Sequence, residues 1–208
     1  MEPGDVTESL LDAILANRPV VVPHLHLPLQ SGCDSVLAKM NRQYKLGAYL
    51  DMIEMVNDRL IVDGLPPAIS TDVICGFPTE REHDFDETYA IAKQVGFMHM
   101  HIFPYSVRTG TAAARWKQLP PQVVRERVQR LLALDEELSL KYRQQLIGRQ
   151  VEVIIEQSAN KEGHMRGRCE YYAEITVPTT ERHGSLIAVK VTEVTNQTTV
   201  GLPTLAIL

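Results

Sequence analysis

The stretch ISTDVICGFPTEREHDF, residues 69–85, combines an apolar strand pattern with an abrupt glycine–proline turn and an acidic restart. Its β-branched first half is typical of a strand buried in a sheet. Gly76 and Pro78 end that pattern, and a helical spacing resumes over residues 84–95. Ligands of parallel α/β proteins bind where strands end, so this turn is the first candidate for a binding site.

Two more strands are expected around this one. Segments 20–30 and 97–106 are apolar and short, and they flank the strand at 67–75 along the chain. Apolar residues at spacings of three and four predict a helix over 46–61 between the first two strands. Connections of this length imply parallel pairing in right-handed units. Near-continuous apolar strands indicate helices on both faces of the sheet, or a closing barrel.

Further helices are expected at 5–17, 34–40 and 121–147. The first is predicted from the capping-box pattern of Asp5 and Glu8, and the third from the proline pair that opens it. After Gly148 the pattern changes to short strands with period-two alternation, which is typical of a small antiparallel barrel. The expected domains are therefore 1–147 and 148–208. The expected strands of the second are 149–157, 170–178, 186–194 and 200–207, with residues 160–168 as a connection.

Composition describes an ordinary globular chain. The 208 residues are 44% hydrophobic and 23% charged, with no apolar run long enough to span a membrane. The amino-terminal residues lack a secretory signal, so a cytoplasmic location is expected. Cys33, Cys75 and Cys169 have no disulfide or metal-binding spacing and are expected to be buried. Residues 101–149 carry 9 Lys and Arg against 4 Asp and Glu, which could suit phosphate binding, but a solvated helix face is the preferred interpretation.

Histidines recur in pairs on two expected strands. His24 and His26 share one strand face, as do His99 and His101. Such pairs are able to ligate a metal, but no carboxylate has a matching position at a strand end. A hydrogen-bonded polar layer is the preferred interpretation, and no metal site and no catalytic residue is predicted.

Three long motifs resemble a known family. HLHLPLQSGCDSVLAKMNRQY (24–44), TDVICGFPTEREHDFDETY (71–89) and HIFPYSVRTGTAAAR (101–115) resemble the second half of the radical S-adenosylmethionine methylthiotransferases. Residues 148–195 resemble the TRAM domain, a small RNA-binding barrel. The likeness is greatest to the branch acting on threonylcarbamoyladenosine in tRNA. The isopentenyladenosine and ribosomal-protein branches are the alternatives. Cys33 and Thr79 depart from the usual motifs.

This resemblance implies the second half of a parallel (β/α)6 partial barrel followed by an OB-like TRAM barrel. It implies S-adenosylmethionine and [4Fe–4S] clusters as cofactors. The CxxxCxxC motif that holds such a cluster is absent from this sequence. The chain alone is therefore expected to be inactive. Its expected partners are the missing amino-terminal half of the enzyme and tRNA, and no association with a membrane is expected. A tRNA-binding protein without catalysis, or a truncated reading frame, are the rival interpretations.

The resemblance also implies site residues. The expected contacts to S-adenosylmethionine are Gln30, Ser31, Gly32, Asp72, Ile74, Gly76, Tyr105 and Ser106, with the backbone around Ile74 and Gly76 receiving the adenine. The candidate tRNA contacts are Arg166, Arg168, Tyr171 and Tyr172. A base of the tRNA would stack on tyrosine, and arginine would pair with a phosphate. The alternative for the two tyrosines is that one belongs to the core. A half-barrel would also leave the strand at 21–27 as an open edge that needs a covering segment.

Overall fold

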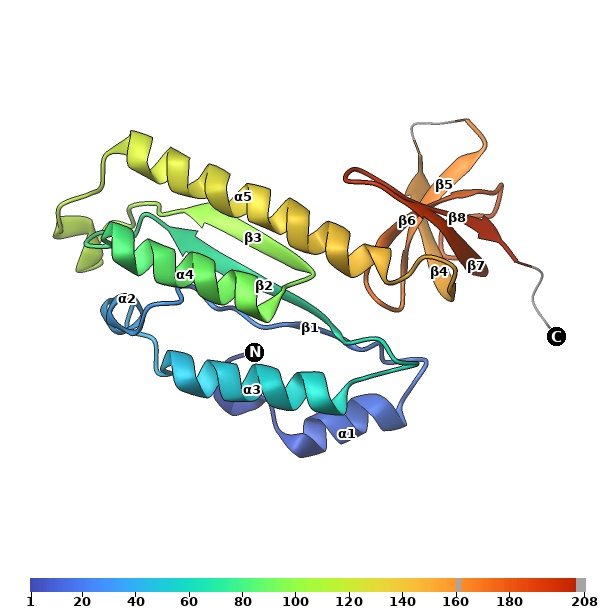
Figure 1. The fold of residues 1–208 in the computed structure, drawn as a ribbon, viewed down its shortest axis with the longest axis horizontal. Coiled ribbons are helices and arrows are strands. Elements are labelled where there is room, and N and C mark those ends of the chain that lie inside the picture. The colour runs from blue at the N-terminus through green and yellow to red at the C-terminus, as the bar shows by residue number, and fades with distance from the viewer. Residues whose placement is uncertain (160–161, 205–208) are drawn as a thin grey trace.

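A long helix joins a three-stranded parallel sheet to a five-stranded closed barrel (Figure 1). This computed structural model describes residues 1–159 and 162–204. The sheet has the strand order β1-β2-β3, and the barrel has the order β4-β5-β6-β8-β7. In the part of the chain so described, no helix is long and apolar enough to cross a membrane.

The parallel sheet consists of β1 (His24–His26), β2 (Ala68–Cys75) and β3 (His99–Pro104). β2 lies in the centre and pairs with both neighbours in parallel, as the lengths of the crossovers predicted. Beyond β1, an isolated bridge between Gln30 and Val73 extends the pairing toward the strand ends.

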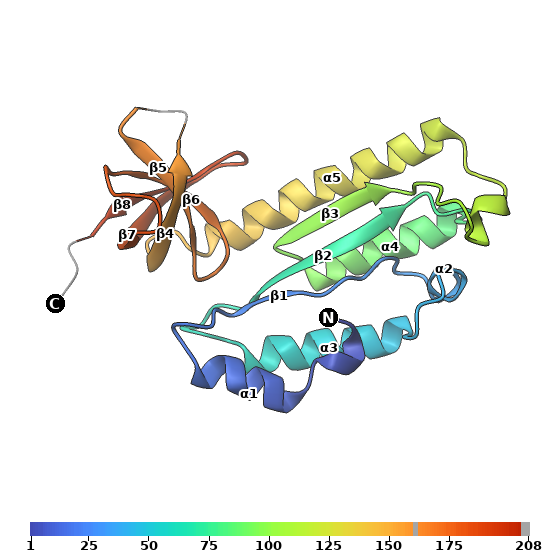
Figure 2. The same cartoon turned by 180° about the vertical axis from the view of Figure 1, so that it is seen from behind.

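Helices cover one face of this sheet. In Figure 2 the strands lie in front of α4 and α5, with no helix over the face turned to the viewer. The helices are α1 (Glu8–Ala16), α2 (Asp34–Lys39), α3 (Leu46–Arg59), α4 (Glu82–Val95) and α5 (Pro121–Gln144). Two 3₁₀ turns, η1 (Pro3–Asp5) and η2 (Ala113–Arg115), complete the set.

The two faces of the sheet differ because side chains alternate along each strand. Leu25, Val73 and Met100 are at most 5% exposed and pack in one core cluster with helical residues such as Phe85 and Leu131. The intervening positions carry histidine, serine and aspartate and face away from that core. The expected apolar strands with both faces covered are therefore not found in the described residues.

Capping explains two helix starts. Thr7, whose Oγ1 accepts the Leu10 N–H at 3.2 Å, is the cap of α1. Asp5, the predicted cap, lies in η1 instead, where its carboxylate accepts a hydrogen bond from the Glu2 N–H. α4 begins with Arg81, whose N–H donates to Asp84 at 2.8 Å, and ends at Gly96 in the left-handed conformation.

The barrel strands are β4 (Gln150–Ser158), β5 (His164–Cys169), β6 (Glu174–Pro178), β7 (Leu186–Val194) and β8 (Thr199–Pro203). β5 occupies the segment expected to be a connection, and Tyr171 and Tyr172 lie in the turn that follows it. The expectations for residues 160–161 and 205–207 fall outside the described residues. Inward-facing valines and isoleucines form the barrel core: Val151, Val153, Ile155, Ile175, Val177, Val189 and Val191.

The barrel is anchored to the carboxyl end of α5. Tyr142 and Leu146 belong to the same core cluster as the barrel valines. Arg143 donates to the carbonyl oxygens of Thr195 at 2.9 Å and Asn196 at 3.1 Å. These contacts hold the β7–β8 turn against the helix and so place the barrel beside the uncovered sheet face.

Gly167→Ala should destabilise the barrel by about 1–3 kcal/mol, because a Cβ there would lie 2.0 Å from the Ile154 carbonyl oxygen. Gly47→Ala is the matched control: that position in α3 has open space, and alanine favours a helix. Urea unfolding followed by circular dichroism measures both. Equal midpoints for the two variants would show that β4 and β5 do not pack this closely.

Candidate functional site

Two adjoining cavities lie on the sheet face that the helices leave uncovered. The strand-end cavity, of about 660 Å³, lies where β1, β2 and β3 end. The sheet–barrel cleft, of about 820 Å³, lies between the same sheet face and the barrel. Asp72 and Phe103 line both cavities. One continuous surface therefore runs from the strand ends to the barrel.

The strand-end cavity brings together five of the eight residues predicted to contact S-adenosylmethionine. Its volume lies within the range of about 300–1,000 Å³ that is usual for small-ligand sites. The structure thus supports a small-molecule site at the predicted edge of the sheet. The five predicted residues in its lining are Gln30, Asp72, Ile74, Tyr105 and Ser106.

Gln30 holds the β1 side of this cavity against β2. It has a positive φ of 60° and is 6% exposed. Its N–H donates to the Asp72 carbonyl oxygen at 2.8 Å, and its own carbonyl accepts the Ile74 N–H at 2.9 Å. The Ile74 N–H is therefore engaged within the protein. A backbone contact between Ile74 and an adenine would therefore have to use a group other than this N–H, and that contact stays a prediction.

Ser31 and Gly32 fasten the same loop to α4, and neither lines the strand-end cavity. The Ser31 hydroxyl lies 3.2 Å from Thr88 Oγ1, and the Gly32 N–H donates to that oxygen at 2.9 Å. A Cβ on Gly32 would lie 2.7 Å from the Thr88 Cα, so glycine is required for this close approach. Both residues hold the loop that carries Gln30 against α4. This position differs from their predicted role as residues that contact the cofactor.

Gly76 is the third predicted cofactor contact that does not line the strand-end cavity. It is held by Glu80 and packs against α5. It has a φ of 78°, and a Cβ there would lie 2.6 Å from Val124. Its N–H donates to Glu80 Oε2 at 2.8 Å, so it too is unavailable for an adenine. The glycine permits the left-handed turn that ends β2, and the predicted backbone contact is not formed by its N–H group.

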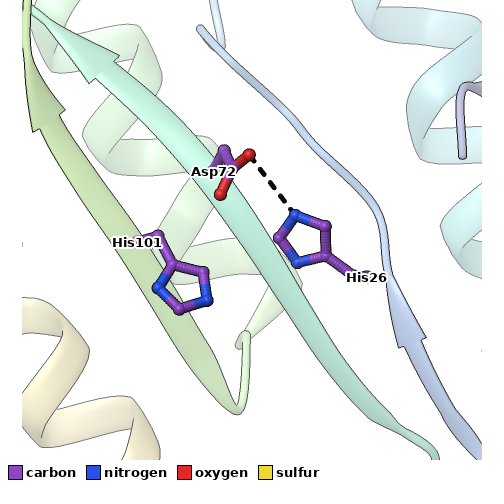
Figure 3. A group of neighbouring side chains, drawn as sticks. All are labelled: His26, Asp72 and His101. Atoms are coloured by element: carbon purple, nitrogen blue, oxygen red, sulfur yellow. Dashed lines mark ion pairs between the residues drawn. The ribbon is translucent and has the colours of Figure 1, made fainter.

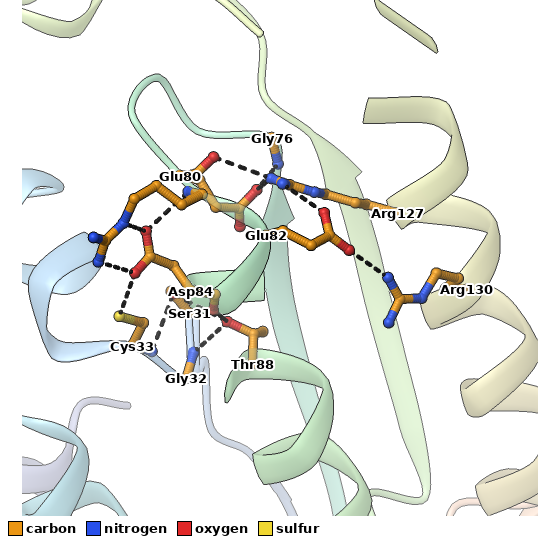
Figure 4. Close-up of polar contacts among 11 residues, drawn as sticks. Ser31, Gly32, Cys33, Gly76, Glu80, Glu82, Asp84, Thr88, Arg127 and Arg130 are labelled. Carbon is orange, nitrogen blue, oxygen red and sulfur yellow. Dashed lines mark hydrogen bonds and ion pairs between the residues drawn. The ribbon is translucent and has the colours of Figure 1, made fainter. Parts of the chain in front are cut away.

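A buried ion pair clamps this turn (Figure 4). Arg127 Nη1 donates to Glu80 Oε2 at 2.6 Å and Nη2 to Glu82 at 2.9 Å. Glu80 and Arg127 are each 4% exposed. Burial raises the pKa of the Glu80 carboxyl, and the Arg127 charge opposes that shift. Sequence reasoning missed both residues, because their partnership joins a loop and a helix 47 positions apart.

Asp84 makes a second clamp beside the first (Figure 4). Arg81 donates to it through its backbone N–H and through Nε and Nη2, at 2.8, 3.1 and 2.9 Å. These hydrogen bonds hold the pKa of the Asp84 carboxyl well below its usual range, against the effect of burial. The Cys33 thiol also donates to it at 3.5 Å, which ties the β1 loop to the start of α4.

The sheet–barrel cleft contains three of the four candidate tRNA contacts. Arg166, Arg168 and Tyr172 line it, together with Arg143 of α5. Arg168 lies over the Tyr172 ring at 4.8 Å. Tyr171 is 3% exposed and belongs to the barrel core, so no base can stack on it. That prediction is wrong, and the alternative that one of the two tyrosines is core is observed.

Tyr172 is already stacked on the sheet. Its ring lies 3.6 Å from that of His24, with an angle of 5° between the planes. Burial lowers the pKa of His24 to about 4, and the charges of His26 and Arg168 act in the same direction. The neutral imidazole therefore closes one end of the cleft by an aromatic contact between the sheet and the barrel.

The cysteines do not form an iron–sulfur site. Cys33, Cys75 and Cys169 are buried in three different core clusters. Burial raises the pKa of Cys75 and of Cys169 to about 12, which keeps their thiols protonated. Among the described residues, each cluster of potential metal ligands contains at most one cysteine. The thiolates that a [4Fe–4S] cluster requires are thus not provided here, whereas the strand-end cavity has room for S-adenosylmethionine.

The chain is similar in sequence to proteins that are named as tRNA-modifying enzymes. The chain is 40% identical over 202 residues to a tRNA-2-methylthio-N(6)-dimethylallyladenosine synthase of Nocardia farcinica, covering 92% of this chain and 39% of that protein. Synthases of the same name from Acidothermus cellulolyticus and Protochlamydia amoebophila are 41% and 35% identical, with 92% and 96% of this chain and 39% and 44% of theirs covered. The chain thus spans about two fifths of the length of these relatives. No family model matches it.

These names correct the predicted branch. The relatives are named for dimethylallyladenosine, which is the isopentenyl-type base, and the preference for the threonylcarbamoyladenosine branch is wrong. A solved structure of coproporphyrinogen III oxidase from Escherichia coli, described as a radical SAM enzyme, matches with a TM-score of 0.52 and 18% identity. The matched region covers 66% of this chain and 31% of the oxidase chain, and over this region the two proteins share a fold. The chain is similar in sequence to part of tRNA methylthio-synthases and in fold to part of a radical SAM enzyme.

Arg127→Ala should destabilise the chain by about 3–5 kcal/mol, because it leaves the buried Glu80 carboxylate without its partner. Arg130→Ala is the control, since Arg130 pairs with Glu82 and Asp86 at 45% side-chain exposure and should cost about 1 kcal/mol or less. Chemical denaturation of both variants measures the difference. Equal losses would show that the Glu80 pair does not clamp the turn.

His24→Phe should reduce the dependence of stability on pH. In the unfolded chain His24 protonates near its ordinary pKa of about 6.5, whereas the folded protein keeps it neutral down to about 4. The unfolded state therefore binds more protons in this window, and the free energy of unfolding falls as the pH is lowered from about 6.5 toward 4. Phenylalanine keeps a ring for Tyr172 but cannot titrate, so the variant should lose less stability.

Denaturation at several pH values tests this difference between the two proteins. Hydrogen bonding to Asp135 raises the pKa of His99, which gives a slope of opposite sign, but that slope is shared by both proteins and cancels. Parallel pH profiles for the wild type and His24→Phe would contradict the burial of a neutral His24.

Proposed function

We propose that this chain is the carboxy-terminal part of an enzyme that adds a methylthio group to N6-dimethylallyladenosine in tRNA. S-adenosylmethionine would occupy the strand-end cavity, and the tRNA would enter the sheet–barrel cleft. The observation that carries the proposal is the continuity of the two cavities through Asp72 and Phe103. It brings a cofactor-sized site and a site rimmed by arginine and tyrosine onto one surface.

The chemistry requires a second part of the protein. The described cysteines cannot hold a cluster, so the [4Fe–4S] groups would come from an amino-terminal half that pairs with this chain. β1 is an edge strand of the parallel sheet, which leaves its outer hydrogen-bonding side for such a segment. Within this division, residues 1–147 would contribute half of the radical SAM barrel and residues 148–208 the TRAM domain. A cytoplasmic location would follow from the tRNA substrate.

The roles of individual residues follow from their positions. Gln30, Asp72, Tyr105 and Ser106 would contact S-adenosylmethionine through polar atoms, and Ile74 would offer an apolar surface. Ser31, Gly32 and Gly76 would act as positioning residues, since they hold the loops that shape the cavity. Arg166 and Arg168 would pair with phosphates.

A chimera tests the reaction. The matching part of the Nocardia farcinica synthase is replaced by this chain, and the chimera is expressed in bacteria that lack their own synthase. Mass spectrometry of tRNA nucleosides should show 2-methylthio-N6-dimethylallyladenosine, and Asp72→Ala should remove it. A product on threonylcarbamoyladenosine, or none from a folded chimera that binds its clusters, would overturn the proposal.

Direct binding tests the two sites without catalysis. The chain alone should bind tRNA with an affinity that falls as salt rises, and Arg166→Ala with Arg168→Ala should lower the slope of log affinity against log salt by about 2. Arg182→Ala is a control on an exposed arginine outside the cleft. Filter binding at several salt concentrations measures this. An unchanged slope would leave the cleft without a role in tRNA binding.

A further inference from the structure

The uncovered sheet face carries a row of histidines around one carboxylate. His26 is in register with Ser70 on the neighbouring strand, and His101 is in register with Asp72. Because these positions share one face, three adjacent strands bring His26, Asp72 and His101 together (Figure 3). One ligand atom from each lies within 4.8 Å of the others. The sequence pairs at 24/26 and 99/101 thus meet the carboxylate whose absence argued against a metal.

The distances suit a metal ion. His26 Nε2 lies 3.3 Å from Asp72 Oδ2. Around a tetrahedral ion with bonds of about 2.0–2.1 Å, neighbouring ligand atoms are separated by about 3.3 Å. His101 is exposed, and its ligand atom lies within 4.8 Å of the other two. Two imidazoles and one carboxylate form a donor set typical of zinc and ferrous iron.

The hydrogen bonds behind His26 orient it as a ligand. Its Nδ1 lies 3.0 Å from Ser70 Oγ, and that oxygen lies 3.1 Å from His24 Nε2. A serine hydroxyl can both donate and accept a hydrogen bond. Ser70 can therefore accept a hydrogen bond from His26 Nδ1–H while it donates one to Nε2 of the neutral His24. In this arrangement the lone pair of His26 Nε2 faces the Asp72 carboxylate. A cation between these two atoms would stabilise that tautomer, whereas in the other tautomer Nε2–H donates directly to the Asp72 carboxylate.

The neighbouring groups leave this cluster available. The remaining histidine of the row, His99, is engaged by Asp135 at 3.0 Å. In the described residues the Asp72 carboxylate has His26 as its one ion-pair partner. The second candidate cluster, at Cys33, differs because both oxygens of Asp84 already bind Arg81.

We propose that His26, Asp72 and His101 bind one divalent transition-metal ion of the zinc or ferrous-iron type. Three protein ligands leave a coordination position open, and these residues all line the sheet–barrel cleft. The ion would therefore face whatever enters that cleft. This site goes beyond the proposed tRNA modification, since it needs no iron–sulfur cluster, although it shares Asp72 with the strand-end cavity.

Titration of the full 208-residue chain with metal tests the site. Protein freed of metal by chelation is titrated with Co²⁺ and followed by visible absorption, and the Zn²⁺ affinity is measured by competition with a chromophoric chelator. One ion per chain should bind, with the intense absorption of four- or five-coordinate cobalt. His26→Ala, Asp72→Asn and His101→Ala should each weaken binding at least ~10-fold.

Two controls separate the site from surface histidines. His99→Asn removes an imidazole of the same row, and His83→Ala removes one that is 74% exposed; both should retain wild-type affinity. Ser70→Ala keeps all three ligands, so it should weaken binding about 10-fold while preserving the cobalt spectrum. Thermal unfolding without metal confirms that the variants fold, and Zn²⁺ should raise the midpoint of the wild type but not of Asp72→Asn.

Wild-type affinity no greater than that of a His26→Ala/His101→Ala double variant would overturn the proposal. Loss of binding in His99→Asn would also overturn it, because the ligand set would then be a different one. Neither result depends on tRNA or on S-adenosylmethionine, so the metal site and the proposed function can fail separately.

Discussion

The alternation of side chains along three parallel strands is the constraint on which the functional surface depends. Leucine, valine and methionine at every second position bind the sheet to its helices, and this fixes which residues point the other way. Ser70, Asp72 and the histidines are therefore collected on one face. A slip of one residue in β2 would place Asp72 in the apolar core and remove it from both cavities at once.

The shape of the strand ends depends on a second layer of contacts behind them. Glu80, Arg127 and Asp84 line neither the strand-end cavity nor the sheet–barrel cleft, yet they hold the turn after β2 and the start of α4. Burying such charges is costly, and the geometry compensates because Gly76, Arg81 and Arg127 donate hydrogen bonds to these carboxylates. These contacts fix the loops that shape the strand-end cavity.

Most elements could be predicted from the sequence because local patterns determine them. The helix at 46–61 and the strand at 186–194 follow from periodicity, and they lie where it predicts. β5 was missed because His164 to Cys169 contains a glycine and two arginines, which resemble a turn. Gly167 is there for a tertiary reason, because a Cβ at this position would lie 2.0 Å from the Ile154 carbonyl oxygen, and no local pattern reveals that.

The site was predictable as an edge of the sheet but not residue by residue. A motif indicates that Gln30, Ser31 and Gly32 matter, but only the fold shows that one faces the cavity and two face α4. The same holds for Asp72. Along the chain it is one carboxylate in a strand, whereas in register with His101 and beside His26 it becomes the charged centre of a polar layer. Because Asp72 borders both cavities, any ion or ligand that alters its charge in one cavity also alters the field in the other. The two halves of this surface are therefore coupled through a single side chain.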